Sequence, residues 1–161
     1  MEPNSCCFTG HRHIDPALLP LLTAHLDASL RALVQMGCLQ FYAGGALGFD
    51  TLAAERVLAL KQEYPEIKLH LLLPCPDQCH SWPNEERTRY ECILSRADSY
   101  RYISSTYSVA AMTKRNRALV ANADACIAFL QKEASGTGQT VRAARQAGLT
   151  VINLADRMPL P

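Results

Sequence analysis

Two glycine-rich stretches carry the residues best suited to binding an anion. The first, GGALGFD, brings together Gly44, Gly45, Gly48 and Asp50. The second, SGTGQT, contains Ser135, Gly136, Thr137, Gly138 and Thr140. Glycine has no Cβ, so backbone N–H groups in such a stretch can approach a ligand closely. When the stretch leads into a helix, its free N–H groups lie at the positive end of the helix dipole, and each stretch therefore predicts a site for phosphate or carboxylate.

Polar side chains in two other stretches add to the candidates. TGHRH supplies Gly10, His11 and Arg12, and KRNR supplies Arg115 and Asn116. A histidine can donate to a phosphate or transfer a proton, and an arginine offers planar, bidentate donors. The structural alternatives are a loop histidine that caps the next helix or faces water, and a solvated arginine within a run of charges. For the glycine stretches, the alternative is a simple turn followed by an aspartate N-cap.

Apolar runs alternate with helical patterns along the whole sequence. We predict strands over residues 5–9, 39–43, 67–73, 100–103, 125–130 and 149–154. We predict helices from Asp15 or Pro20 to Gly37, from about 50 to Pro65, and over about 84–97, 108–122 and 139–148. Apolar strands that alternate with helices form a parallel sheet with helices on both faces. With right-handed crossovers, we expect a doubly wound, Rossmann-like α/β sandwich in a single domain over residues 1–161.

This fold places the candidate loops at one edge of the sheet. TGHRH, GGALGFD and SGTGQT each follow a predicted strand, and open parallel sheets bind ligands at the carboxyl ends of their strands. Two glycine loops at that edge favour a phosphate-bearing ligand. Neither loop has the Lys-Ser/Thr of a P-loop, and the first strand ends in a single glycine rather than GxGxxG. P-loop and standard dinucleotide binding are therefore disfavoured.

Composition narrows the classes of partner. The formal net charge of +1 provides no long-range attraction for nucleic acid or an anionic membrane. The N-terminus lacks the basic and apolar regions of a signal peptide, and no apolar run approaches the ~20 residues of a membrane span. The 7 cysteines are odd in number and scattered, which favours reduced thiols in a cytoplasmic protein. Cys75, Cys79 and His80 match no strong zinc pattern, so we expect no metal site.

The motifs resemble those of the SLOG superfamily of Rossmann-like domains. GGALGFD is similar to the SGxAxGID element of the DNA-processing protein DprA, and RNRALVANAD (115–124) is similar to its RNRIIAGLS. Residues 112–140 resemble the MxxRKxxMxxxADxxIALPGGxGTxxE region of LOG-type, lysine-decarboxylase-like phosphoribohydrolases. The ordered set of CCFTGHR, a Trp and a Pro before the third helix, and RN…AD is most similar to the YpsA-like group of small bacterial proteins. The resemblance extends from Cys6 to about Leu154.

This resemblance implies a nucleotide or nucleotide-derived ligand, with its phosphate at the SGTG loop. It places Gly44 to Asp50 on one side of the ligand and Ser135 to Thr140 on the other, with Arg115 at the position of an active-site arginine of the LOG enzymes. At the position of the LOG glutamate, which supports cleavage of the N-glycosidic bond, this chain has Arg142. The absent acid favours a sensor or binding module. Relatives in the superfamily commonly self-associate, and an exposed helix face could serve for this, but the sequence does not fix the oligomeric state.

Two other functions remain open at this point. The first is an enzyme acting on nucleotide or nucleotide-sugar N-glycosidic bonds, in which His11 or Asp50 replaces the glutamate. The second, less favoured, is single-stranded DNA binding by analogy with DprA, which requires a basic track and stacking aromatics. Arg87, Arg89, Arg96 and Arg101 alternate with tyrosines, but at helical spacing they scatter around the helix. Trp82 either folds over a base as a lid or anchors its proline-rich loop to the core.

Overall fold

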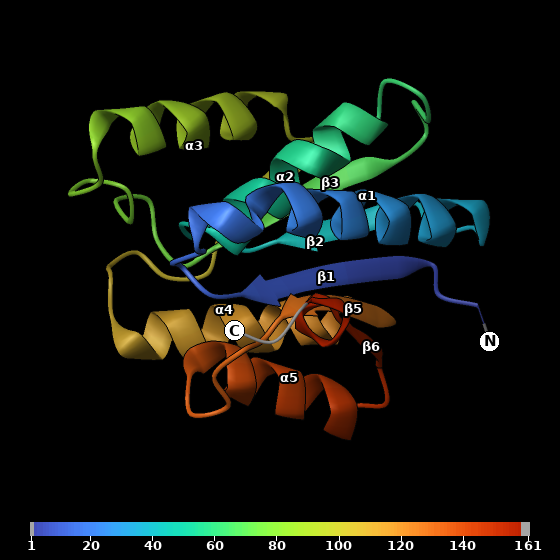
Figure 1. Ribbon diagram of the computed structural model, residues 1–161. Coiled ribbons are helices and arrows are strands. Elements are labelled where there is room, and N and C mark those ends of the chain that lie inside the picture. The colour runs from blue at the N-terminus through green and yellow to red at the C-terminus, as the bar shows by residue number, and fades with distance from the viewer. Residues whose placement is uncertain (1, 159–161) are drawn as a thin grey trace.

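The computed structural model describes residues 2–158, and its six strands form one sheet in the order β4-β3-β2-β1-β5-β6 (Figure 1). Every neighbouring pair of strands is parallel. The strands are β1 (Ser5–Gly10), β2 (Gln40–Ala43), β3 (Lys68–Leu73), β4 (Ser99–Tyr102), β5 (Ala125–Phe129) and β6 (Thr150–Asn153). The helices are α1 (Leu19–Gln35), α2 (Phe49–Leu60), α3 (Asn84–Arg96), α4 (Val109–Ala121) and α5 (Gly136–Gln146). The predicted doubly wound α/β fold is confirmed.

Helices cover both faces of the sheet and divide the core in two. In Figure 1, α1, α2 and α3 lie on one side of the sheet, and α4 and α5 lie on the other. The larger apolar cluster, which includes Phe8, Phe41 and Phe49, fills the α1–α3 side. A smaller cluster, which includes Leu119 and Val141, fills the α4–α5 side. Strands β1 and β5 are buried on both faces, as expected of the central strands of a parallel sheet.

Helix α1 is apolar enough to be compared with a membrane span, but its buried residues show that it packs on the sheet. By length and composition alone, Pro16–Gln35 could cross a membrane, which differs from the expectation that no such run exists. A stripe of leucines at three- and four-residue spacing, however, is buried in the larger cluster: Leu22, Leu26, Leu30 and Leu33. Such a one-sided stripe is typical of a helix that packs on a sheet. The segment begins with a 3₁₀ turn at Pro16–Leu18, in which Asp15 Oδ1 accepts from the N–H of Ala17 at 3.0 Å.

The strand order creates an opening beside β1. From β1 the chain passes to α1 on one face of the sheet and then to β2, whereas from β5 it passes to α5 on the other face and then to β6. The loops that follow β1 and β5 therefore lead to opposite faces of the sheet. Doubly wound sheets bind ligands at this switch point, outside the carboxyl ends of the strands.

Candidate functional site

A cavity of about 330 Å³ lies at the switch point between β1 and β5. This volume falls within the range of about 300–1,000 Å³ that is usual for small-molecule sites. Nine of the residues predicted from the sequence line it: Gly10, His11, Arg12, Asp50, Arg115, Asn116, Ser135, Gly136 and Thr137. The structure thus brings the loops after β1 and β5 together with the face of α4 and the start of α2.

The beginning of α5 supplies backbone donors to the cavity. The Ser135 hydroxyl caps the helix by accepting from the N–H of Gly138 at 3.0 Å and donating to the carbonyl of Lys132 at 2.5 Å. The N–H groups of Gly136 and Thr137, at the first two positions of the helix, have no hydrogen-bond partner among residues 2–158. Two free donors therefore lie at the positive end of an 11-residue helix, which favours an anion.

Arg115 contributes a buried positive charge from α4. The residue is only 3% exposed, yet it lines the cavity. Its Nη1 donates to the carbonyl of Gly44, and its Nε donates to Oδ1 of Asn116 at 2.8 Å. Its Nη2 has no partner within the described part of the chain. Burial lowers the pKa of Arg115 and nearby Asp50 opposes this, so the guanidinium is a desolvated cation that an anionic ligand would stabilise.

Asp50 lies in the first turn of α2 and is the cavity's one carboxylate among residues 2–158. It is 5% exposed, and its Oδ2 accepts from the N–H of Ala46 at 3.2 Å. Burial raises the pKa of Asp50, whereas Arg115, the Ala46 N–H and Arg12 act in the opposite direction. The cavity therefore combines donors for an anion with one acceptor suited to a hydroxyl group.

His11 connects two loops of the site, a role that the sequence analysis did not anticipate. Its Nε2 accepts from the backbone N–H groups of Gln131 at 2.9 Å and Lys132 at 3.1 Å. An Nε2 that accepts two hydrogen bonds carries no proton, so the neutral ring holds its proton on Nδ1. Burial, and to a lesser extent the charge of Lys132, lowers the pKa of His11. Nδ1 is the ring atom that could still donate to a ligand.

This arrangement predicts a loss of stability in acid. The unfolded state binds the proton first because the pKa of folded His11 lies below its ordinary value of 6.5. The contribution of His11 is therefore complete above pH 6.5 and is lost as the pH falls through the folded pKa. Urea unfolding of the natural protein and a His11→Gln variant at pH 7.5 and 5.5 measures this. His70 shifts in the same direction in both proteins, so only the difference between them reports on His11.

We expect the natural protein to lose more stability than His11→Gln between the two pH values. Glutamine carries no titratable group but can accept hydrogen bonds from the same N–H groups. Equal losses would show that protonation of His11 does not open the contact between the two loops.

The three glycines of GGALGFD lie beside the cavity rather than in its lining. Gly48 has a φ of +79°, and a Cβ there would lie 2.3 Å from the carbonyl oxygen of Arg12. A Cβ on Gly44 would lie 2.6 Å from Nη1 of Arg115. Gly45 packs against Leu73. These glycines allow neighbouring site segments to pack closely, and contact between their N–H groups and a ligand stays a prediction.

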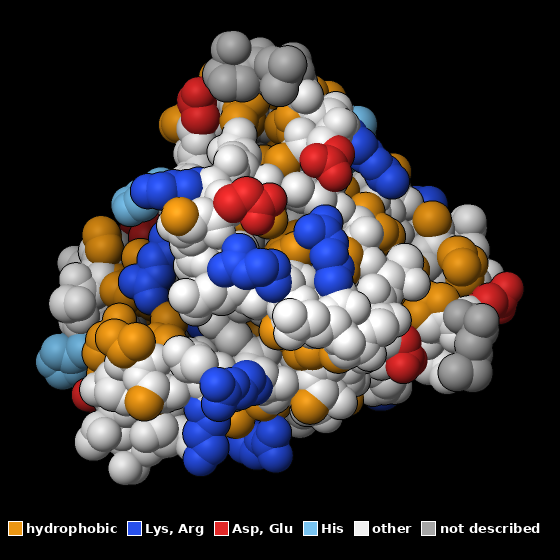
Figure 2. Space-filling model, turned by 90° about the horizontal axis from the view of Figure 1, so that it is seen from below, with side chains coloured by type: hydrophobic (Ala, Val, Ile, Leu, Met, Phe, Trp, Pro, Cys, Tyr) orange, Lys and Arg blue, Asp and Glu red, His pale blue; other side chains and the backbone are white. Residues whose placement is uncertain are grey.

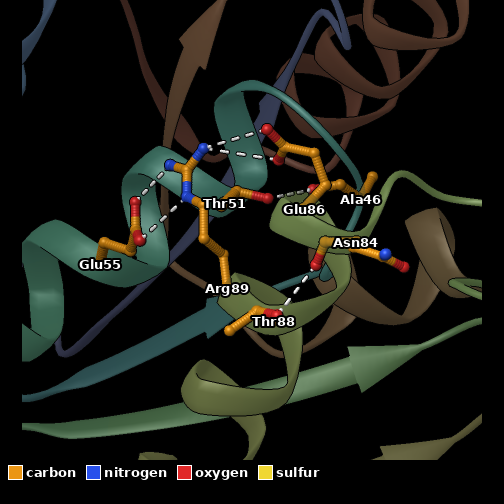
Figure 3. A network of polar contacts seen from close by, with 7 residues as sticks. All are labelled: Ala46, Thr51, Glu55, Asn84, Glu86, Thr88 and Arg89. Atoms are coloured by element: carbon orange, nitrogen blue, oxygen red, sulfur yellow. Dashed lines mark hydrogen bonds and ion pairs between the residues drawn. The ribbon is translucent and has the colours of Figure 1, made fainter.

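A threonine and an ion-pair network fix this first glycine loop. The Thr51 hydroxyl donates to the carbonyl of Ala46 at 2.9 Å (Figure 3). One turn further along α2, Glu55 accepts from Arg89 of α3, which also contacts Glu86 at 3.4 Å. These contacts hold the start of α2, and with it Asp50, against α3.

The second glycine loop contains residues that support its shape. Gly138 lies close to the carbonyl of Glu133, where a Cβ would be at 2.0 Å, and the Thr140 hydroxyl donates to the carbonyl of Gly136 at 3.0 Å. Neither lines the main cavity. Thr140 instead lines a groove of about 190 Å³ between α4 and α5, next to Asn116.

Arg142 is outside the cavity. Its guanidinium is about half exposed, with Nη1 donating to the carbonyl of Glu133 at 3.3 Å and lying 3.8 Å from that residue's carboxylate. Arg142 therefore does not line the cavity. Within α5, Gln139 lines the cavity instead.

Several lining residues were missed by the sequence analysis. They include Thr9 of β1, Gln139 of α5, and Met112 and Thr113 of α4. On α4, Met112, Arg115 and Leu119 recur at three- and four-residue spacing, so they share one face of the helix. This periodicity, together with the predicted ligand contact of Arg115, could have indicated from the sequence that this face of α4 lines the cavity.

The cysteine-rich loop brings no metal-binding group together. Among residues 2–158, no three His, Cys, Asp or Glu side chains are placed to hold a metal ion. Cys75 is fully buried, and burial raises the pKa of its thiol. All 7 cysteines are free thiols.

Two of the four arginines considered for a DNA-binding track already interact with other groups of the protein. Arg89 pairs with Glu55 and Glu86, and Arg87 donates to the carbonyl of His80. Figure 2 shows the face covered by α4 and α5, where Lys and Arg side chains form several separate groups. Arg87, Arg89 and Arg96 belong to α3, which lies on the other side of the sheet (Figure 1), so they do not join these groups into one basic track.

Solved structures and curated proteins show what this chain is similar to. A structure of DNA processing protein A from Helicobacter pylori, described for its unique single-stranded DNA binding mode, superimposes with a TM-score of 0.65 at 22% identity. The match covers 91% of this chain and 63% of that chain, so this chain spans less than two thirds of its length. This likeness concerns the fold.

Sequence relatives are closer. A UPF0398 protein of Bacillus pumilus (strain SAFR-032) is 30% identical over 125 residues, which is 76% of this chain and 67% of the relative. A UPF0398 protein of Bacillus cereus (strain Q1) is 32% identical over 126 residues, or 76% of this chain and 68% of the relative. The profile of the YspA SLOG family matches residues 6–149. The family resemblance seen in the motifs is confirmed, and the chain belongs to the YspA SLOG family.

Proposed function

We propose that the cavity binds the phosphate of a nucleotide or nucleotide-derived ligand, and that the protein is a binding module or sensor for it. One observation carries this proposal: the free N–H groups of Gly136 and Thr137 share a cavity with the buried guanidinium of Arg115. Helix N–H donors and a desolvated arginine are both complementary to phosphate. The exposed side chain of Arg12 adds a further positive charge at the same cavity.

Asp50 favours a sugar phosphate over phosphate alone. A buried carboxylate repels a bare anion but accepts hydrogen bonds from hydroxyl groups. Its Oδ2 already accepts from Ala46, and Oδ1 has no partner among residues 2–158. A ribose beside the bound phosphate would supply such hydroxyl donors. The combination of Asp50 with the phosphate donors therefore supports a nucleotide.

A thermal-shift series tests this function. Phosphate, ribose 5-phosphate, AMP, ADP, ADP-ribose, NAD and cyclic nucleotides are compared at equal ionic strength. A ligand that binds only the folded state raises the melting temperature with its concentration. We expect at least one phosphate-bearing nucleotide to raise it, and the corresponding nucleoside to do so less. No shift with any of these compounds at millimolar concentration would contradict the proposal.

We also expect no appreciable release of adenine from AMP. Cleavage at the anomeric carbon develops positive charge on the sugar, which an ionised carboxylate must stabilise. Asp50 is the one carboxylate among residues 2–158 that lines the cavity, and it lies beside the positive charge of Arg115, which opposes a positive charge developing on the sugar. The assay follows free adenine by chromatography. Turnover by the natural protein that disappears in Asp50→Asn would establish the alternative, an enzyme acting on N-glycosidic bonds.

The free thiols support a reducing, cytoplasmic location for this binding module. All 7 cysteines are unpaired, including neighbours across β1 and β5 such as Cys7 and Cys126. Disulfides are rare in the cytosol, where thiols are kept reduced.

A further inference from the structure

A second cavity, of about 320 Å³, adjoins the first along the same edge of the sheet. Arg12 lines both cavities, and the consecutive residues Ala46 and Leu47 line the first and the second respectively. The two cavities are therefore neighbours.

Besides Arg12 of the loop after β1, three loops at the carboxyl ends of strands form the second cavity. Leu47 belongs to the loop between β2 and α2, and Tyr107 belongs to the loop between β4 and α4. The loop between β3 and α3 contributes most of the remaining lining: Asp77, Gln78, Ser81 and Trp82. The cavities at the carboxyl ends of the strands thus extend from the switch point to the ends of β3 and β4.

The lining combines apolar surfaces with a fixed hydrogen-bonding group. Trp82 is held edge-on against Tyr90, with ring centroids 5.3 Å apart and an interplanar angle of 80°. Trp82 therefore anchors its loop to the core and still lines the cavity. Tyr107 is 55% exposed, so its side chain is open to stacking.

Gln78 is the residue whose side-chain amide could form a hydrogen bond with a nucleobase. It is 7% exposed, and its Nε2 donates to the hydroxyl of Tyr90 at 3.4 Å. Its Oε1 has no hydrogen-bond partner among residues 2–158. Among residues 2–158 the one buried side-chain atom without a partner is Nε of Arg87, so Oε1 of Gln78 is accessible and can accept from a ligand that supplies an N–H donor. An exocyclic amino group on a planar ring is such a donor.

We propose that the second cavity is the subsite for the base of the ligand, with the ring against Tyr107 and its exocyclic amino group donating to Gln78. This inference rests on the proposed function, because the phosphate is bound in the first cavity. It assigns Gln78 the role of selecting amino-bearing bases over those with an oxo group. Arg12, at the junction, is placed beside the phosphate and sugar that connect the two parts.

The experiment compares ribose 5-phosphate, AMP and IMP, since IMP has an oxo group in place of the exocyclic amino group of AMP and carries its N–H donor on the ring nitrogen N1. Binding is measured by calorimetry and by the fluorescence of Trp82, the single tryptophan. We expect AMP to bind roughly tenfold or more tightly than both other compounds and to alter the fluorescence, while ribose 5-phosphate leaves it unchanged. Tyr107→Ala should weaken AMP roughly tenfold, and Tyr107→Phe should retain the affinity.

Gln78→Leu should remove the preference for AMP over IMP. Because Gln78 is buried, each variant's unfolding is checked, and the exposed Tyr107 provides a second test that does not depend on Gln78. Equal affinities for ribose 5-phosphate and AMP, with unaltered Trp82 fluorescence, would overturn the base subsite and leave the phosphate site standing. Absence of binding by all three compounds would overturn the subsite and count against the proposed function as well.

Discussion

A Gly136→Val variant is expected to fold normally and to bind AMP at least tenfold more weakly than the natural protein. A Cβ built on Gly136 meets no atom within 4 Å, and its backbone does not have a positive φ, so valine fits without strain. Gly136 nevertheless lines the cavity and carries one of the free N–H groups of α5. A branched side chain would occupy the space that a phosphate must enter, and tenfold corresponds to about 1.4 kcal/mol.

The measurement is a pair of titrations, one by calorimetry with AMP and one by urea unfolding. Gly136→Ala is the graded control, because it adds only the Cβ and also reduces the freedom of the unfolded chain. It should be at least as stable as the natural protein and intermediate in affinity. Unchanged AMP affinity in a folded Gly136→Val protein would mean that the loop is only a turn.

Replacing Arg115 with glutamine is expected to reduce AMP affinity by roughly 10- to 100-fold. Hydrogen bonds to a charged group contribute about 1.5–3 kcal/mol, and the guanidinium is buried in the cavity with a free Nη2. The same change leaves the carbonyl of Gly44 without its donor and Asp50 without its neighbouring cation. Stability should therefore fall as well, by about 1–3 kcal/mol.

A double variant separates the two effects of Arg115. Arg115→Gln combined with Asp50→Asn removes both charges, so it should be more stable than Arg115→Gln alone while AMP binding stays weak. Lys114→Gln is the matched control, since Lys114 is the preceding residue of α4, is exposed and does not line the cavity. Equal losses of AMP affinity in Lys114→Gln and Arg115→Gln would indicate only a general effect of charge.

The fold was predictable because its signals are local. Apolar strands and helical periodicity indicated the order and type of the elements, and no predicted strand bound differs from the observed one by more than one residue. Helix α5 begins at Gly136 rather than near 139, since Ser135 caps it within the glycine stretch. In the sequence, a serine followed by glycines suggests that the loop continues, although the serine here caps a helix that begins at the next residue.

The site was predicted in outline, but the roles of individual residues depend on contacts far apart in the sequence. Gly48 must be glycine because the backbone of Arg12 lies against it, and no pattern within GGALGFD indicates that neighbour. His11 accepts from N–H groups 120 and 121 residues away. Arg142 is aligned with a catalytic position by sequence, yet its side chain turns back to Glu133.

The central claim is that a phosphate binds between the start of α5 and Arg115. The most direct measurement is the position of the phosphorus atom in a crystal structure with the nucleotide that most raises the melting temperature. We predict phosphate oxygens within hydrogen-bond distance of the N–H groups of Gly136 and Thr137 and of the Arg115 guanidinium. A nucleotide found reproducibly at the amino ends of the strands, on the opposite edge of the sheet, would contradict the account.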